Sequence, residues 1–355
     1  MCKSSQHSKP RVAITMGDPC GVGPEIIVRC FQSLQLPEHC LPIVIGDLNA
    51  LRRAIDLLHA ELDVLLIEDL VDFEPVVQPS ILYMVSPSQL AREDIAYGQP
   101  SSNTCRAVIQ YIEQAACFAM EGQVDAVCTC PINKANLQKQ GFSFPGHTEF
   151  LQELTHAKDV VMMLSGAKLR VSLVTIHHAL ADVPGILTED LIYRTIAITA
   201  EALMQDFGLE SANVGVAGLN PHAGEQGRLG REELELIQPT IRRFHNAPYR
   251  VSGPFAPDTL FRRAYEGEFD AVVAMYHDQG LIPVKLLHFH DAVNVTLGLP
   301  IVRTSVDHGT AYDLAGTGKA HPGSLNAAIH LAVQLAQNRR LRTLWTGPGR
   351  ENFHP

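Results

Sequence analysis

Short apolar runs of strand length recur along this chain, and a stretch with helical character separates each from the next. Of these helical stretches, PEIIVRCFQSL has Pro24 in its first turn, and EDLIYRTIAITAEALMQDFG ends at Gly208, a residue type that often terminates helices. Strands that alternate with helices predict an α/β fold with a largely parallel sheet. The clearest apolar runs are RVAITMG (11–17), LPIVIGD (41–47), VDAVCTC (124–130) and DVVMMLS (159–165).

Bulk composition limits the class of protein. The chain has 355 residues, of which 46% are hydrophobic and 19% charged, so it can bury a sizeable core, and its length favours two domains over one. The net charge of -10 argues against a nucleic-acid partner, which would require a basic face. The start, MCKSSQHSKPRVAITMG, has no apolar run before the first strand, so we expect no signal peptide, no membrane anchor and a cytoplasmic location.

The cysteines favour reduced thiols over disulfides or a zinc cluster. All eight lie in the first half of the chain, and no two of them form a Cys-x-x-Cys pair. Cys128 and Cys130 flank one residue at the end of a predicted strand, which would suit a metal, although the alternating faces of a strand explain the spacing better.

Three histidines each follow an apolar, strand-like run. His177 follows LRVSLVTI, His222 follows NVGVAGLNP and His277 follows FDAVVAMY. If these strands are neighbours in one sheet, the three imidazoles converge at its carboxyl edge, where open α/β sheets place their sites. Three imidazole nitrogens and one open position are typical of a catalytic metal site. The alternative is that each histidine caps its own loop and never meets the others.

Two segments in the first half combine glycine with polar residues at a predicted helix start. TMGDPCGVGPE (15–25) joins a strand to a helix, where backbone amides often receive an anion, but tight turns explain its glycines equally well. It lacks a lysine and the Walker A and GxGxxG patterns, which disfavours a phosphotransferase. In PGHTEFL (145–151), His147 and Thr148 suit a phosphate or carboxylate, and a helix N-cap is an equal explanation for Thr148.

The second half contains further glycine-rich loops. GLNPHAGEQGRLGREE (218–233) surrounds a histidine with glycine, which suggests that backbone approaches a ligand there. DHGTAYDLAGTGKAHPGS (307–324) has the composition of a ligand-binding loop.

Side chains that can donate hydrogen bonds also recur at a fixed spacing. MYHDQGLIPVK (275–285) ends at Lys285, and Asn294 and Arg303 follow at intervals of nine residues. These side chains could face one anionic substrate, and a solvated lysine and arginine are the alternative.

Taken together, eight motifs in the expected order resemble the PdxA family of 4-hydroxythreonine-4-phosphate dehydrogenases of vitamin B6 biosynthesis. The resemblance extends over about residues 11–335. It implies an isocitrate/isopropylmalate-dehydrogenase-like α/β fold with two domains and a cleft between them. Residues 1–135 and 300–355 would form the first domain, and 136–299 the second, with the metal histidines and the interface of a homodimer. The motifs are TMGDPCGVGPE, PINKANL, PGHTEFL, GLNPHAGE, PDTLF, YHDQGL, VNVTLGLP and RTSVDHGTA.

The resemblance also implies a metal site. His177, His222 and His277 would hold one divalent ion such as Zn, Mg, Co or Mn. The chain differs from the family pattern at the doublet His177-His178, where one histidine is usual, and the alignment of the preceding Thr175 favours His177. It also differs at a position where a small residue is common and this chain has cysteine, Cys20.

For substrate and cofactor, the resemblance implies two groups of residues. NAD, or NADP, would lie against a loop where a carboxylate accepts hydrogen bonds from the ribose hydroxyls and repels a 2′-phosphate, which favours NAD. Residues from both subunits would complete each site. The substrate residues are His147, Thr148, Lys285, Asn294 and Arg303, and the cofactor residues are His308, Gly309, Thr310, Ala311 and Asp313.

The implied reaction is the metal-dependent, NAD(P)-linked oxidation of 4-phosphooxy-L-threonine to a β-keto acid, which decarboxylates to 3-amino-2-oxopropyl phosphate. Lys285, Asp258 and Asp278 are the candidate catalytic residues, although Lys285 also suits an anion anchor and both aspartates suit support of a histidine. The alternatives are dehydrogenases of 4-phospho-D-threonate, 4-phospho-D-erythronate or a cyclic dihydrodiol acid. A non-catalytic protein that binds a metal or a nucleotide on the same scaffold is a further alternative.

Overall fold

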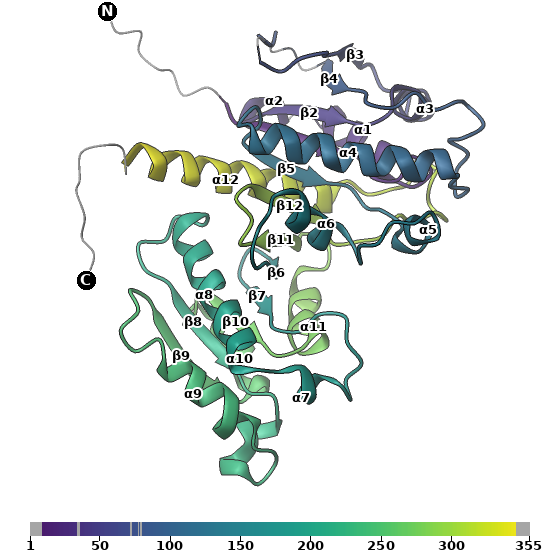
Figure 1. Ribbon diagram of the computed structural model, residues 1–355. Helices are drawn as coiled ribbons and strands as arrows, with labels where there is room; N and C mark the ends of the chain where they lie inside the picture. The colour runs from purple at the N-terminus through teal and green to yellow at the C-terminus, as the bar shows by residue number, and fades with distance from the viewer. Residues whose placement is uncertain (1–8, 34–35, 72, 77, 79, 346–355) are drawn as a thin grey trace, which may run out of the picture. The chain divides into compact units, whose positions relative to one another are not determined.

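The computed structural model describes residues 9–33, 36–71, 73–76, 78 and 80–345, and it divides into two compact units (Figure 1). Unit 1 comprises Met1–Lys158 and Leu299–Val333, and unit 2 comprises Asp159–Gly298 and Gln334–Pro355. Each unit is an α/β structure built on its own set of strands, as the alternation of apolar runs and helical stretches predicts.

This division differs from the expected one in two segments. Residues 136–158 belong to unit 1, because their helix α6 (His147–Leu154) packs on α4 (Ser102–Met120) of that unit. Residues 334–345 belong to unit 2, where the Arg339 guanidinium donates two hydrogen bonds, of 2.6 and 3.0 Å, to the Asp206 carboxylate.

The strands of unit 1 lie in the order β3-β4-β2-β1-β5-β12, and every described pair of neighbours is parallel. Parallel strands with helices on their faces are buried on both sides, which explains why they appear in the sequence as continuous apolar runs. The strands are β1 (Arg11–Thr15), β2 (Leu41–Ile45), β3 (Asp63–Leu66), β4 (Ile81–Val85), β5 (Ala126–Thr129) and β12 (Val302–Val306).

The helices of unit 1 begin at local capping signals. Asp47 accepts hydrogen bonds from the first amides of α3, and Ser101 and Thr104 form a capping box at the start of α4. Helix α4 lies across β1, β2 and β5, in front of them in Figure 1. The helices are α1 (Gly23–Gln32), α2 (Leu36–His39), α3 (Leu48–Leu57), α4 (Ser102–Met120), α5 (Lys134–Lys139), α6 (His147–Leu154) and the first part of α12 (Gly323–Trp345).

The strands of unit 2 lie in the order β11-β6-β7-β10-β8-β9. Strands β7, β10, β8 and β9 are parallel to one another, but β6 is antiparallel to both β7 and β11. The antiparallel pairing of β6 and β7 follows from the tight turn that joins them. In this turn the Gly166 amide donates a hydrogen bond to the Leu169 carbonyl, and the turn is too short to contain a crossover helix. The strands are β6 (Val161–Ser165), β7 (Arg170–Leu173), β8 (Asn213–Ala217), β9 (Arg250–Phe255), β10 (Ala271–Ala274) and β11 (Val293–Leu297).

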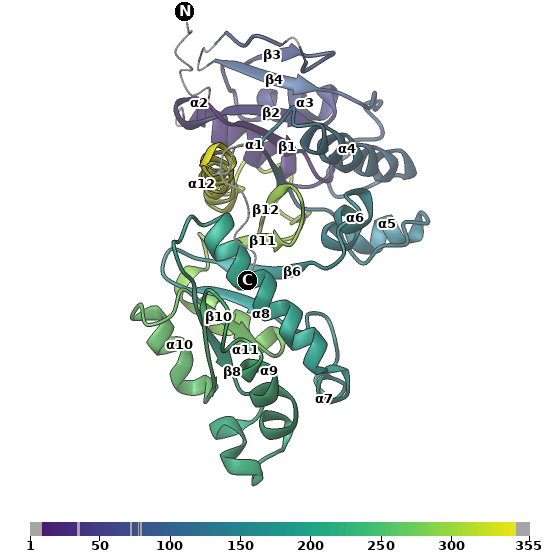
Figure 2. The ribbon, with the colours of Figure 1, turned by 60° about the vertical axis from the view of Figure 1, so that its left-hand side comes forward.

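The helices of unit 2 cover these strands. Helix α8 packs on five of the strands and crosses in front of them in Figure 2, and α10 and α11 pack on β10. In the part of the chain that the structure describes, every helix is too short or too polar to cross a membrane. The helices are α7 (Val183–Ile186), α8 (Glu189–Gln205), the 3₁₀ helix η1 (Pro221–Gly227), the π-helix η2 (Glu233–Ile237), α9 (Gln238–Arg242), α10 (Pro257–Tyr265) and α11 (His277–His288).

The described cysteines are all free thiols, in agreement with the expectation from their spacing. Cys128 and Cys130 are completely buried, and burial raises the pKa of both thiols. Protonated, buried thiols are poor metal ligands and poor nucleophiles, so these two residues serve packing.

Candidate functional site

The strands that precede the three histidines are neighbours in unit 2. Strand β10 lies between β7 and β8, and all three are parallel, so that Ala274 pairs with Leu173 and Val273 with Val216. The strands therefore end at the same edge of the sheet, the carboxyl edge where open α/β proteins bind ligands.

His177 and His277 come together at this edge. Their ring centroids are 5.8 Å apart, with 38° between the ring planes. Nδ1 of His277, the first residue of α11, is 2.7 Å from Oδ1 of Asp278, which leaves Nε2 as the nitrogen for a further partner. Both rings line a pocket of about 440 Å³ together with Ile176, His178, Leu180, Val183, Tyr276 and Asp278.

His222 does not join this pair. It is exposed on η1, within a run of residues 222–226 that all have positive φ. Over residues 9–345, excluding the few gaps noted above, no three His, Cys, Asp or Glu side chains are grouped closely enough to hold a metal ion. The structure thus gathers two of the three predicted ligands and leaves the third on a neighbouring loop.

A second cluster of predicted site residues lies in unit 1. Arg303 on β12 is 3% exposed and donates a 2.8 Å hydrogen bond from Nη2 to Oγ1 of Thr129. Burial lowers the pKa of Arg303 to about 10, although Cys128 and Glu149 oppose that shift. Even so, the guanidinium carries its charge at neutral pH and places a buried positive charge in this unit.

His147, the first residue of α6, lies beside this charge. Its side chain is buried, and its Nε2 has no hydrogen-bond partner among the residues that the structure describes. Burial, together with the charges of Arg303 and Lys134, holds the pKa of His147 well below its ordinary value. A neutral imidazole whose buried nitrogen lacks a partner can form a hydrogen bond with a ligand.

Thr148 is not the N-cap of α6. That position belongs to Gly146, which has no side chain to bond the first amides of the helix. A Cβ at Gly146 would meet only the flexible end of the Lys134 side chain, 2.9 Å from its Cε, so space alone does not require glycine there. The N-terminus of α6 therefore presents amides without a side-chain cap next to a lysine, a combination that attracts anions.

The remaining substrate and catalytic candidates lie in unit 2. Asn294 on β11 has a buried Oδ1 without a hydrogen-bond partner among the described residues. Lys285 is half-buried on α11, and Asp258 is exposed in the first turn of α10. Of the five predicted substrate residues, His147, Thr148 and Arg303 belong to unit 1, and Lys285 and Asn294 to unit 2.

Hydrogen bonds attach the predicted cofactor loop of unit 1 to the TMGDPCGVGPE segment. The Val22 amide donates a 3.0 Å hydrogen bond to the Thr310 carbonyl, and the Tyr312 hydroxyl donates to the Asp18 carboxylate. Further along, the Glu25 carboxylate accepts the amides of Gly316 and Gly318. Of the predicted cofactor residues, His308, Gly309 and Asp313 are exposed.

These contacts explain the glycines of the TMGDPCGVGPE segment. A Cβ at Gly21 would lie 2.8 Å from the Thr310 carbonyl oxygen, and a Cβ at Gly23 only 2.0 Å from that of Met16. Protein backbone, and not an open ligand cradle, approaches both positions. Asp18 is buried beneath the loop, and burial raises the pKa of its carboxyl group against the hydrogen bonds from Tyr312 and the Cys20 amide.

Comparison with known proteins identifies the family. The sequence model described as "Pyridoxal phosphate biosynthetic protein PdxA" matches residues 38–332. The 4-hydroxythreonine-4-phosphate dehydrogenase of Desulfosudis oleivorans is 49% identical, with 93% of this chain and 97% of the relative covered. The chain belongs to the PdxA family. The predicted resemblance is thereby confirmed.

Two further proteins show the breadth of the PdxA likeness. The crystal structure of 4-hydroxythreonine-4-phosphate dehydrogenase from Klebsiella pneumoniae superposes with a TM-score of 0.84 at 37% identity, covering 93% of this chain and 100% of that one. The D-threonate 4-phosphate dehydrogenase of Pectobacterium atrosepticum is 40% identical, with 92% of this chain and 99% of the relative covered. Dehydrogenases named for two different substrates are therefore similar to this PdxA protein.

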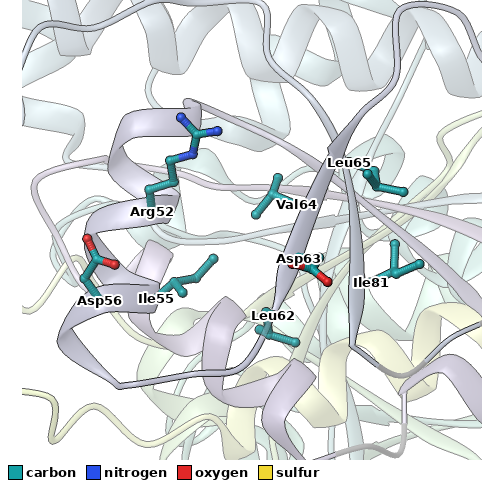
Figure 3. A pocket seen from close by; sticks show the side chains of 8 residues that line it. All are labelled: Arg52, Ile55, Asp56, Leu62, Asp63, Val64, Leu65 and Ile81. Carbon is teal, nitrogen blue, oxygen red and sulfur yellow. The ribbon is translucent and has the colours of Figure 1, made fainter.

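Unit 1 of this PdxA protein has another pocket, of about 430 Å³, between α3 and β3 (Figure 3). Its charged residues are Arg52, Asp56 and Asp63, and its other lining residues are apolar. No residue predicted for the substrate, the metal or the cofactor lines it, so it plays no part in the candidate site.

Sequence reasoning overlooked the residues that hold the site residues in place. Gln279 in unit 2, and Asp18 and Glu25 in unit 1, are buried polar side chains that bond to loops far away in the sequence. The buried Glu233 of unit 2 bonds to Asn220, 13 positions earlier. The only signal for them in the sequence is their position inside or next to a motif: Gln279 is two residues after His277. Their bonding partners follow from the tertiary structure alone.

Proposed function

We propose that this protein oxidises 4-phosphooxy-L-threonine at its secondary alcohol and releases 3-amino-2-oxopropyl phosphate and CO₂. The alcohol loses two electrons and two protons in the oxidation, one hydride to NAD and one proton to a base. Loss of CO₂ from the resulting β-keto acid completes the reaction. The observation that carries the proposal is the paired His177 and His277 rings in one pocket, in a family whose named members include 4-hydroxythreonine-4-phosphate dehydrogenases.

The donor set in this pocket suits a divalent metal ion. His177 and His277 line the same pocket, and the carboxylate of Asp278 engages Nδ1 of His277 in the way that outer carboxylates orient metal-ligating imidazoles. His222 is proposed as the third ligand, from the loop after the adjacent strand. When bound, the ion would supply a Lewis acid for the alcohol oxygen and the nicotinamide would supply a hydride acceptor.

The positive cluster of unit 1 suits the phosphate of the substrate. Arg303 provides a permanent charge, His147 a buried ring nitrogen without a partner, and Thr148 a hydroxyl in the first turn of α6. We assign Lys285 and Asn294 to the same substrate as further donors. This role of Lys285 follows from its cationic side chain, which anchors anions when it is protonated.

The base that takes the alcohol proton is proposed from the two aspartates and Lys285. Asp278 is engaged with His277, which favours a positioning role for it. Asp258 and Lys285 then remain as candidates for proton transfer. Single Asp258→Asn and Lys285→Met variants distinguish them, because loss of the base removes one limb of the pH profile of kcat, whereas loss of an anchor raises KM.

NAD is proposed to lie against the loop that contains His308, Gly309, Thr310, Ala311 and Asp313. The exposed carboxylate of Asp313 would accept hydrogen bonds from ribose hydroxyls and repel a 2′-phosphate. Comparison of kcat/KM for NAD and NADP tests this preference.

A homodimer is proposed, with α11 at its interface. Ile282, Leu286 and Phe289 are 63%, 82% and 73% exposed and follow one another at helical spacing of four and three residues. Such an apolar stripe, on the helix that begins with His277, is typical of a surface that another protein covers. A second copy of this chain as the partner would bring residues of both subunits to each site.

The test of the proposed function is a substrate comparison. Purified protein with a divalent metal and NAD is given 4-phosphooxy-L-threonine, 4-phospho-D-threonate or 4-phospho-D-erythronate, and reduced nicotinamide is followed by absorbance. We expect the highest kcat/KM for 4-phosphooxy-L-threonine. Turnover of the two sugar acids alone would overturn the proposed substrate and favour the activity for which the Pectobacterium relative is named.

A further inference from the structure

We infer that Gln279 is a positioning residue that holds the loop of His222 against the helix of His277. The inference rests on the proposed function, because it concerns the proposed metal ligands. Gln279 neither lines the pocket of His177 and His277 nor belongs to the proposed ligands. Its importance follows from a series of hydrogen bonds that connects the ends of β7, β10 and β8.

The first hydrogen bonds of this series join the end of β7 to the end of β10. Thr175, two residues before His177, donates hydrogen bonds from its amide and its hydroxyl to the carbonyl of Met275, at 3.2 and 2.8 Å. Met275 in turn is two residues before His277. The backbone that precedes one proposed ligand is thereby fixed to the backbone that precedes the next.

Gln279 provides the second link, from β10 to β8. Its Oε1 accepts a 2.7 Å hydrogen bond from the Met275 amide, and its Nε2 donates a 2.7 Å hydrogen bond to the Gly218 carbonyl. The side chain is 9% exposed, so both bonds are shielded from water. A side-chain amide accepts at its oxygen and donates at its nitrogen without carrying a charge, which suits this buried position.

The loop that Gln279 holds is in an unfavourable backbone conformation. From His222 to Gln226, every residue has positive φ, between 42° and 76°, and only one of the five is glycine. Each non-glycine residue in this region costs on the order of 1 kcal/mol, so the loop persists only because surrounding contacts hold it. Runs of this kind occur where a fold fixes a functional side chain.

Glu233 holds the other side of the same loop. Its buried carboxylate accepts hydrogen bonds from the amide and the side chain of Asn220, at 2.7 and 3.0 Å. A Cβ at Gly224 would lie 2.5 Å from Oε2 of Glu233. The loop is thus held on one side by Glu233, which leaves Gln279 as the link to α11 and His277.

The experiment measures metal affinity directly. Zn²⁺ is titrated into the metal-free full-length protein in competition with a chromophoric chelator. Replacing Gln279 by Glu keeps the acceptor for Met275, and the ionised carboxylate has no donor for Gly218. We expect Gln279→Glu to weaken Zn²⁺ binding by about 10- to 100-fold, the range found when partners of metal ligands are removed. Gln152→Glu is the matched control, because it removes an exposed 3.1 Å hydrogen bond from a Gln side chain to the Lys158 carbonyl.

A double-mutant cycle separates positioning from general structural damage. If Gln279 acts through His222, Gln279→Glu weakens Zn²⁺ binding in the wild type but not in the His222→Ala background. Equal losses in both backgrounds, or unchanged affinity of Gln279→Glu, would overturn the inference. Failure of the wild type to bind Zn²⁺ would instead overturn the metal site of the proposed function.

Folding is controlled in the same series. Thermal unfolding of each metal-free variant shows whether the fold is intact. Should Gln279→Glu not fold, Gln279→Met removes both hydrogen bonds without adding a charge and enters the same cycle. Hydrogen exchange of residues 218–230 in the wild type provides an independent measurement. Slower exchange with Zn²⁺ bound is expected, and identical exchange with and without Zn²⁺ would contradict the coupling.

Discussion

At the level of single residues, the buried groups of unit 1 show how environment gives an ordinary side chain a specific property. His147 could have been a solvated histidine at a helix start, and it would then titrate near its usual pKa. Burial and the charges of Arg303 and Lys134 instead hold its pKa well below that value, so it stays neutral in the folded protein. When the pH falls below about 6.5, this histidine binds a proton in the unfolded chain but not in the folded protein.

Acid should therefore destabilise the protein through His147. Its folded-state pKa is below the unfolded value of about 6.5, so the stability it contributes is present above that pH and is lost as the pH falls below it. Between pH 7.5 and 5.5, the free energy of unfolding should fall by roughly 1 kcal/mol more in the wild type than in His147→Gln. Urea unfolding of both proteins at both pH values measures this difference. Equal pH dependence would show that His147 titrates normally.

The proposed metal ligands give a second prediction at this scale. His222→Ala should abolish turnover but leave the fold intact, because His222 is exposed and its removal leaves no cavity. Activity with added Zn²⁺ and thermal unfolding of the metal-free variant measure the two effects. His178→Ala is the control, since His178 lies at the same pocket but is not a proposed ligand. Wild-type turnover of His222→Ala would refute its assignment as a ligand.

At the level of elements, two loops of unit 1 depend on one another. The start of α1 supplies Glu25, which is completely buried, and the proposed cofactor loop supplies the amides of Gly316 and Gly318 that Glu25 accepts. Backbone contacts at Thr310 continue the attachment. Buried residues thereby hold the proposed cofactor loop in place, which would lower the entropy cost of ordering it when NAD binds.

Glu25→Gln tests this attachment. The amide nitrogen of glutamine cannot accept a backbone amide, so one of the two hydrogen bonds is lost and a buried donor is left unpaired. We expect a several-fold higher KM for NAD, little change in the KM for the phosphorylated substrate, and a loss of about 1–3 kcal/mol of stability. Steady-state kinetics with each substrate varied gives both constants. Glu113→Gln, on the exposed face of α4, should change neither; equal rises in both KM values would contradict a specific role for the loop.

At the level of the whole molecule, the predicted site residues are divided between two units. Substrate residues come from both units, the proposed metal ligands from unit 2 and the cofactor loop from unit 1. Unit 2 also presents the apolar stripe of Ile282, Leu286 and Phe289 on α11. Because α11 begins at His277, the same helix carries this stripe and one of the proposed metal ligands.

Charged substitutions on the stripe should therefore dissociate the proposed dimer. Leu286→Lys combined with Phe289→Lys places two charges in an apolar interface, and the sedimenting mass should fall to the 38.9 kDa of one chain. Activity should fall with it, because each site would lose the residues of the partner. Met120→Lys, at another exposed apolar position, serves as the control. A wild type that sediments as one chain would contradict the dimer itself.

The sequence by itself determined the strands, the fold class and the family. The runs at 11–17, 41–47, 124–130 and 159–165 became β1, β2, β5 and β6, because strands buried on both faces need continuous apolar residues wherever they pair. Pro24 lies in the first turn of α1, as its fixed φ predicts. These are local properties, and neighbouring residues are sufficient to specify them.

Only the tertiary structure decided which segments meet. The order β7-β10-β8, the reversed direction of β6 and the pairing of His177 with His277 depend on contacts between residues far apart in the chain. The bond from Gln279 to Gly218 spans 61 positions, and no local pattern encodes which carbonyl will lie opposite that amide. Long-range packing selects those partners, because a buried polar group must find its hydrogen bond wherever the fold supplies one.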